Sequence, residues 1–219
     1  ACVRCKKLEI RTNLRDLRIN RIFEGTNQVM RLFIAREALD QHLKVAGDVV
    51  MPNVPLWRRF IGLFRAGFFY AWWYPSRWFS WGRWPRYGEF GRLAGHLRWV
   101  HRTSGRLARQ QFHLMVLHGP ALEKKQAQLF RCVDVGAELF AMASVCSRAQ
   151  RDARAGDANA IELADVFCRQ ARQKVENLFE AIRSNADPEA YRLARGVLDG
   201  RFGWLERGIV DVPGAPGQA

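Results

Sequence analysis

Acidic residues are scarce in this chain of 219 residues. Asp and Glu number 21 against 35 Lys and Arg, which gives a formal net charge of +14. An excess of this size favours an anionic partner such as nucleic acid, acidic lipid or a phosphorylated cofactor. The 48% hydrophobic content excludes a disordered or fibrous chain, because such chains lack the apolar surface that offsets the entropy of ordering. Charge alone leaves the three classes of partner open.

The chain also lacks a pattern of paired cysteines or of metal ligands. Its five cysteines are an odd number and are widely spread, which does not fit a secreted disulfide framework and indicates a reducing compartment. Cys2 and Cys5 form one C-x-x-C, but no second pair follows at zinc-ligand spacing. We predict incidental thiols and no metal site. The histidines show no consistent acidic or metal partner and are expected on the surface or in helix packing: His42, His96, His101, His113 and His118.

No apolar run is long enough to suggest a membrane span. Residues 57–102 hold seven of the eight tryptophans, interleaved with arginines and a single acid, Glu89. The stretch without charge covers only 66–76, about half of the ~20 residues that a spanning helix needs. Trp favours the headgroup level and Arg pairs with lipid phosphate, so we predict an amphipathic anchor in the membrane plane. The expected lipid-contacting residues are Trp57, Trp72, Trp73, Trp78, Trp81 and Trp84.

Two other interpretations of this aromatic segment are open. Its rings could pack a small core of their own or lie against further domains. Aromatics interleaved with arginines also make a stacking groove for nucleic acid, but the chain carries no DNA-binding or RNA-binding module signature, so no nucleic-acid partner is predicted.

Strand-like alternation and internal repeats are absent too, and helical periodicity predicts an all-α helical bundle. A helix is expected to begin near Thr26 and to end at Gly47 and Asp48, with Val29, Phe33, Ala35, Leu39 and Leu43 as its buried stripe. Four further helices are expected at 93–117, 121–151, 158–184 and 188–199. The second of these should bury Leu122, Leu129, Cys132, Val133, Gly136, Leu139, Phe140 and Ala143.

Residues 14–32, LRDLRINRIFEGTNQVMRL, form the most informative motif. They closely resemble the acyl-CoA dehydrogenase family, in which R-D-x-R-I-x-x-I-[FY]-E-G-T-[NS]-x-x-x-R carries the catalytic base. The helical extension that follows is similar to the very-long-chain branch, which has an extra C-terminal helical domain and associates with the inner membrane. This extension is most similar to that branch over 139–149 and 190–210.

The resemblance assigns Glu24 as the general base that takes the α-proton of an acyl thioester while hydride leaves the β-carbon for flavin. A carboxylate in water is too weak a base for this proton, so the site must exclude water and acidify the substrate. Gly25 lets the backbone approach the acyl chain without a Cβ. The matching positions imply flavin contacts for Thr26, Asn27 and Gln28. On composition alone, Glu24 and Gly25 would be only an ordinary helix start.

The resemblance also implies partners and a domain organisation. Expected partners are FAD, long-chain acyl-CoA, an anionic membrane surface, electron-transfer flavoprotein and a second copy in a homodimer. The expected domains are 1–46 with the base motif, 47–105 facing the membrane, 106–210 as the C-terminal helical domain, and 211–219 as a disordered tail.

The family's N-terminal helical domain and β-barrel, which hold most flavin contacts, have no counterpart in these residues. We therefore expect the chain to be inactive alone. The alternative is a membrane-binding or protein-interaction module without catalysis. The 29 arginines against six lysines suggest a GC-rich bacterial source, and we expect a cytoplasmic location, peripheral on the inner membrane.

Overall fold

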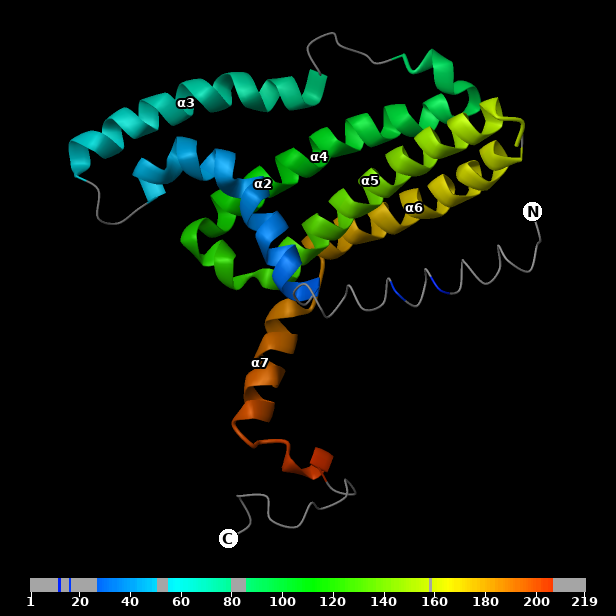
Figure 1. The fold of residues 1–219 in the computed structure, drawn as a ribbon. Coiled ribbons are helices and arrows are strands. Elements are labelled where there is room, and N and C mark those ends of the chain that lie inside the picture. Colours follow the sequence, from blue (N-terminus) through cyan, green and yellow to red (C-terminus); the bar gives the residue numbers. More distant parts are fainter. Residues whose placement is uncertain are drawn as a thin grey trace. The chain divides into compact units, whose positions relative to one another are not determined.

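In the computed structural model, the described residues are Thr12, Asp16, 27–50, 55–79, 86–157 and 159–206. All regular secondary structure in these ranges is helical, which confirms the predicted all-α class (Figure 1). The α-helices are α2 (Asn27–Val50), α3 (Leu56–Phe79), α4 (Ala94–His118), α5 (Gln126–Arg154), α6 (Ala160–Arg183) and α7 (Asp187–Leu198). The 3₁₀ helices are η2 (Gly88–Leu93), η3 (Gly119–Lys124) and η4 (Gly203–Glu206).

Two compact units divide the chain after Arg183. In the first, α4, α5 and α6 run side by side, α2 packs against α5, and α3 packs against α2 and α4. The second contains α7 and η4, where Gly196 lies against the Phe202 ring. A Cβ at Gly196 would approach that ring to 2.9 Å, so glycine permits this close contact.

The α5–α6 pair is a hairpin that turns at Gly156. The φ of Gly156 is 109°, a conformation that glycine adopts without steric cost. Its amide N–H donates to the Ala153 carbonyl, 3.1 Å away, and so satisfies one of the free carbonyls at the end of α5. The turn brings the apolar faces of both helices together.

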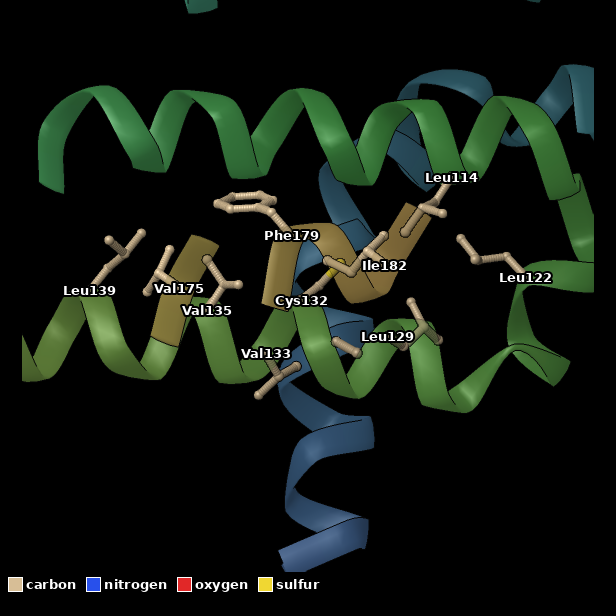
Figure 2. Close-up of a cluster of buried hydrophobic side chains, with 11 residues drawn as sticks. Leu114, Leu122, Leu129, Cys132, Val133, Val135, Leu139, Val175, Phe179 and Ile182 are labelled. Atoms are coloured by element: carbon tan, nitrogen blue, oxygen red, sulfur yellow. The ribbon is translucent and has the colours of Figure 1, made fainter. Parts of the chain in front are cut away.

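Two clusters of buried side chains form the core of the first unit. Figure 2 shows the first, which the α2, α4, η3, α5 and α6 segments build around Phe179 and Val135. Phe179 is only 1% exposed, and the Arg106 guanidinium lies 4.0 Å above its ring centre. The second cluster gathers smaller side chains between η2, α4, α5 and α6: Leu93, Leu97, Met142, Cys146, Ala149, Ala164, Cys168 and Ala171.

Most predicted helix positions are confirmed, with two boundary corrections. Helix α2 continues through Gly47 to Val50, because one glycine costs only about 1 kcal/mol relative to Ala and the helix ends instead just before Pro52. The helix expected over 121–151 is broken at Lys125, whose ψ is 50°. The 3₁₀ turn before this break places Leu122 in the first core cluster.

The predicted buried stripes were wrong at several positions. In α2, Val29, Phe33 and Leu43 are about half exposed, whereas Ala35, His42 and Ala46 face inward. Phe140 of α5 is 75% exposed. The inward face of α2 consists mainly of small side chains, which allow close helix packing. The buried face is therefore not the face that carries the bulkiest apolar residues.

Truncating Phe179 tests the importance of the first cluster. Phe179→Ala is expected to lower the free energy of unfolding by about 3–5 kcal/mol, because it leaves a cavity between tightly packed helices. Phe140→Ala removes the same side chain from an exposed site on α5 and should change it by less than about 0.5 kcal/mol. Urea unfolding followed by circular dichroism measures both. Equal losses for the two variants would contradict the assignment of the core.

Candidate functional site

The motif that carries the candidate base leads directly into α2. Glu24, Gly25 and Thr26 lie outside the described residues, as do Trp81 and Trp84. Asn27 and Gln28 are described, and both are exposed in the first turn of α2. The first N–H groups of a helix have no partner within the helix. The start of α2 thus offers exposed amide side chains three residues after Glu24.

Helix α2 is held against α5 close to this start. The Arg31 guanidinium forms an ion pair with the Asp134 carboxylate at 2.8 Å and lies 5.8 Å from the Phe130 ring centre. One turn later, Ala35 enters the first core cluster. These contacts fix the direction of α2 against α5, and sequence reasoning missed them because Arg31 and Asp134 are far apart in the chain.

A cluster of aromatic rings joins α2, α3 and α4. His42 of α2 is buried, and its Nδ1 is hydrogen-bonded to the Tyr70 hydroxyl of α3 at 3.0 Å. The Trp73 ring meets His42 edge-on at 4.8 Å, and Phe112 of α4 lies 4.6 Å from Tyr70, both between ring centres. Burial lowers the pKa of His42, and the charge of Arg77 lowers it further. Burial raises the pKa of Tyr70. Both side chains are therefore neutral at neutral pH.

The last turns of α3 are fastened to α4. The Tyr74 hydroxyl is hydrogen-bonded to His113 Nε2 at 2.9 Å, and the Arg109 guanidinium donates to the Arg77 carbonyl. Arg109 also lies 4.0 Å above the ring centre of Trp78. A Cβ at Gly105 of α4 would meet the Arg77 carbonyl oxygen at 3.0 Å, so the two helices approach closely here.

The opposite face of α3 carries large exposed apolar side chains. We call this set the α3 stripe: Trp57, Phe60, Ile61, Phe64, Phe68 and Trp72. At about 100° per residue these positions share one face of the helix. Phe64 and Phe68 are the most exposed, at 80% and 84%. Trp78 is exposed as well, but Trp73 is buried at 8% and packs against His42 instead of facing outward.

Within the described residues, no helix combines the length and the apolarity needed to cross a bilayer. Arg58 stacks over the Trp57 ring at 5.5 Å, and the Arg65 guanidinium donates to the Lys44 carbonyl at 3.1 Å. Both arginines lie beside the α3 stripe on the same helix. Two cations, Arg58 and Arg65, thus flank the exposed aromatic side chains of α3.

The expectation that no histidine has a consistent acidic partner was wrong for His96. Its Nε2 is 2.8 Å from Asp165 Oδ1 of α6, and Arg169 pairs with the other carboxylate oxygen at 2.9 Å. The hydrogen bond with His96 is the main cause that lowers the pKa of Asp165. The pair links α4 to α6 across 69 positions of sequence, and no local pattern signals it. Among the described residues, no three His, Cys, Asp or Glu side chains gather as metal ligands.

Comparison with known proteins shows which protein family this chain resembles. Residues 106–199 match the family model described as the ACAD9/ACADV C-terminal domain. The "Probable acyl-CoA dehydrogenase FadE10" of Mycobacterium tuberculosis is 50% identical over 202 residues, which are 90% of this chain and 31% of that protein. The chain is similar to the C-terminal part of acyl-CoA dehydrogenases, which confirms the resemblance to that family.

Enzymes of the very-long-chain branch are also similar to this chain. The mitochondrial very long-chain specific acyl-CoA dehydrogenases of Bos taurus and Homo sapiens are 31% and 30% identical over 209 residues. These residues cover 90% of the chain and 30% of each relative. The chain thus spans about a third of the length of the curated relatives it matches. The roles of individual residues remain predictions, as do the domain boundaries.

The neutral His42 predicts how stability at the α2–α3–α4 contact depends on pH. The folded state lowers the pKa of His42 below its ordinary value of 6.5, so the unfolded chain binds the proton more readily. The resulting stabilisation is complete above 6.5 and is lost as the pH falls through the folded pKa. Between about pH 7.5 and 5, the urea midpoint should therefore fall more for the wild type than for His42→Gln.

His113→Gln is the matched control for this measurement. His113 is exposed and lies at the edge of the same aromatic cluster. This variant should show the same pH dependence as the wild type, because His42 is still present. A wild-type pH dependence that His42→Gln leaves unchanged would show that another group is responsible.

Proposed function

We propose that this chain supplies the catalytic base and the membrane-facing helices of a flavin-dependent acyl-CoA dehydrogenase that acts on long-chain acyl-CoA. The main support is the 50% identity to the mycobacterial acyl-CoA dehydrogenase over 202 residues, together with the long motif around Glu24. In this proposal Glu24 removes the α-proton of the thioester. The apolar Ile22 and Phe23 beside it help to exclude water, which raises the basicity of the carboxylate.

The described start of α2 fits part of a flavin contact. Asn27 and Gln28 present exposed amides there, and the first turn of a helix has N–H groups without a partner inside the helix. Such donors suit the carbonyl and phosphate oxygens of FAD. When bound, FAD supplies the two-electron acceptor for the β-hydride. Thr26, Asn27 and Gln28 would hold it from one side only, and for this reason we expect the isolated 219-residue chain to retain no flavin.

Replacing the base tests this function. The test uses an enzyme that carries this sequence together with flavin-binding domains. In it, Glu24→Gln is expected to lower kcat by about 10²–10⁴-fold, because the amide cannot accept the proton. Flavin content should stay unchanged, since the proposal gives Glu24 no flavin contact. Turnover of a long-chain acyl-CoA and the flavin absorption spectrum are the two measurements.

Glu37→Gln is the control, because Glu37 is an exposed carboxylate of α2. It should keep wild-type turnover. Full activity of Glu24→Gln would overturn the assignment of the base. Loss of flavin in Glu24→Gln would mean that this residue holds the cofactor instead.

We also propose that the α3 stripe contacts an anionic membrane surface. Exposed aromatic residues of this number on one helix face mark an interaction site, and flanking arginines suit lipid phosphate. Trp57, Trp72 and Trp78 remain lipid-contacting candidates. Trp73 would act from within, by holding α3 against α2 and α4. An enzyme for insoluble acyl chains gains from staying at a bilayer, on the cytoplasmic face of the inner membrane in a bacterium.

Vesicle sedimentation tests the membrane contact. The double variant Phe64→Ser and Phe68→Ser should lower partitioning onto phosphatidylglycerol vesicles by at least about tenfold, since burying each ring contributes about 1.5–3 kcal/mol. Binding should also weaken with added salt, because the arginines contribute electrostatically. Phe140→Ser removes an equally exposed ring on α5 and should leave binding unchanged. Equal losses in both variants would show that general hydrophobicity, not the α3 stripe, drives sedimentation.

The remaining partners follow from the same proposal. Electron-transfer flavoprotein would reoxidise the flavin, and the enzyme would form a homodimer. A helical module that binds membrane or protein without catalysis is the alternative, and it would show vesicle binding with no effect of Glu24→Gln on any turnover.

A further inference from the structure

Two cysteine thiols meet in the second core cluster. Cys146 of α5 and Cys168 of α6 lie with their Sγ atoms 3.6 Å apart, and both side chains are fully buried. Their close neighbours in the cluster include Ala149, Ala164 and Ala171. These small side chains let α5 and α6 approach closely enough for two short thiols to touch. A disulfide needs the sulfur atoms about 2.05 Å apart, so the two sulfurs must come about 1.5 Å closer to bond.

A guanidinium stands beside this pair. Arg172 is one helical turn beyond Cys168, and it donates to the Gly95 carbonyl of α4 at 2.8 Å. It also lies 5.1 Å from the Trp99 ring centre. Its buried Nε has no hydrogen-bond partner among the described residues. The Arg172 charge favours the thiolate form of both cysteines. The positive charge of Arg172 would thus stabilise a thiolate at this pair, and its Nε–H still lacks an acceptor among the described residues.

The two thiols differ in how easily they ionise. The hydrogen bond with Cys168 lowers the pKa of Cys146, and the same shared proton raises the pKa of Cys168. Cys132, also buried on α5, has no such neighbour, and burial raises its pKa to about 12. Because the thiolate is the reactive form, Cys146 is the sulfur that would react first with an oxidant.

We propose that Cys146 and Cys168 form a reversible, hydroperoxide-sensitive dithiol that cross-links α5 to α6. The Cys146 thiolate attacks a peroxide oxygen; the S–O bond forms, the O–O bond breaks, and the leaving oxygen takes a proton. Cys168 then attacks the sulfenic sulfur, so the S–S bond forms and water leaves with the Cys168 proton. Two thiols and one hydrogen peroxide give one disulfide and two waters, and a dithiol reductant reverses the change. The inference involves no residue of α2 or α3, so it does not depend on the proposed dehydrogenation.

Peptide mapping of the full chain tests the cross-link. The reduced protein is treated with hydrogen peroxide, alkylated in urea and digested with trypsin and a protease that cleaves after Glu138, which separates Cys132 from Cys146. We expect a linked pair of peptides containing Cys146 and Cys168, about 2 Da lighter than the two reduced peptides together and lost after dithiothreitol. Recovery of both residues as alkylated thiols under excess peroxide would overturn the proposal. So would a link that appears only when the protein is oxidised in urea.

Matched variants separate a reactive pair from two packed core residues. Cys132→Ala should still form the link, whereas Cys146→Ala should not. Arg172→Gln should slow link formation several-fold, and Arg151→Gln, which removes an exposed arginine of α5, should not change the rate. Equal rates in these two arginine variants would show that Arg172 does not activate the pair. If a cysteine variant fails to fold, the peptide map of the wild-type chain still shows whether Cys146 and Cys168 become linked.

Discussion

The packing of α5 against α6 is the constraint on which the rest of the first unit depends. Both helices place fully buried side chains at their interface, with Val135 and Met142 from one and Val175 and Phe179 from the other. The Gly156 turn keeps the two helices adjacent. Helices α4 and α2 pack onto this pair, and α3 packs in turn onto α2 and α4. Loosening the α5–α6 interface would therefore weaken the support of α4 and α2, and through them that of α3.

The candidate catalytic and membrane elements lie at the edge of this core. Helix α2 is attached by Ala35 and by the ion pair between Arg31 and Asp134, close to the motif that carries Glu24. Helix α3 is attached by Tyr70 and Trp73, which meet His42 and Phe112. Such an arrangement suits the proposed function, because a rigid interior can position side chains of α2 and α3 that bind molecules outside the bundle. The family match and the exposed faces of α2 and α3 are consistent with that role.

The sequence was sufficient to predict the helices and the family, but not the contacts between helices. Helix positions follow from local periodicity, Pro and Gly, which are read directly from the chain. Which face is buried depends on the neighbours, and so Phe140 and Phe33 were assigned to the core although both are exposed. The ion pairs of His96 with Asp165 and of Arg31 with Asp134 join residues far apart in the chain. Nothing local marks such pairs. The prediction that Trp73 contacts lipid fails for a similar reason, because composition does not show which way a side chain points.

Phe60, Phe64 and Phe68 of the α3 stripe lie on a different face from the side chains that fasten α3 to α2 and α4. The side chains that fasten α3, such as Tyr70 and Trp73, belong to its opposite face. Substitutions along Phe60, Phe64 and Phe68 are therefore under little packing constraint. Evolution can make this surface more apolar, more basic or fully polar while the bundle stays intact. Members of one family could in this way keep the same fold and differ in where in the cell, and how tightly, they attach.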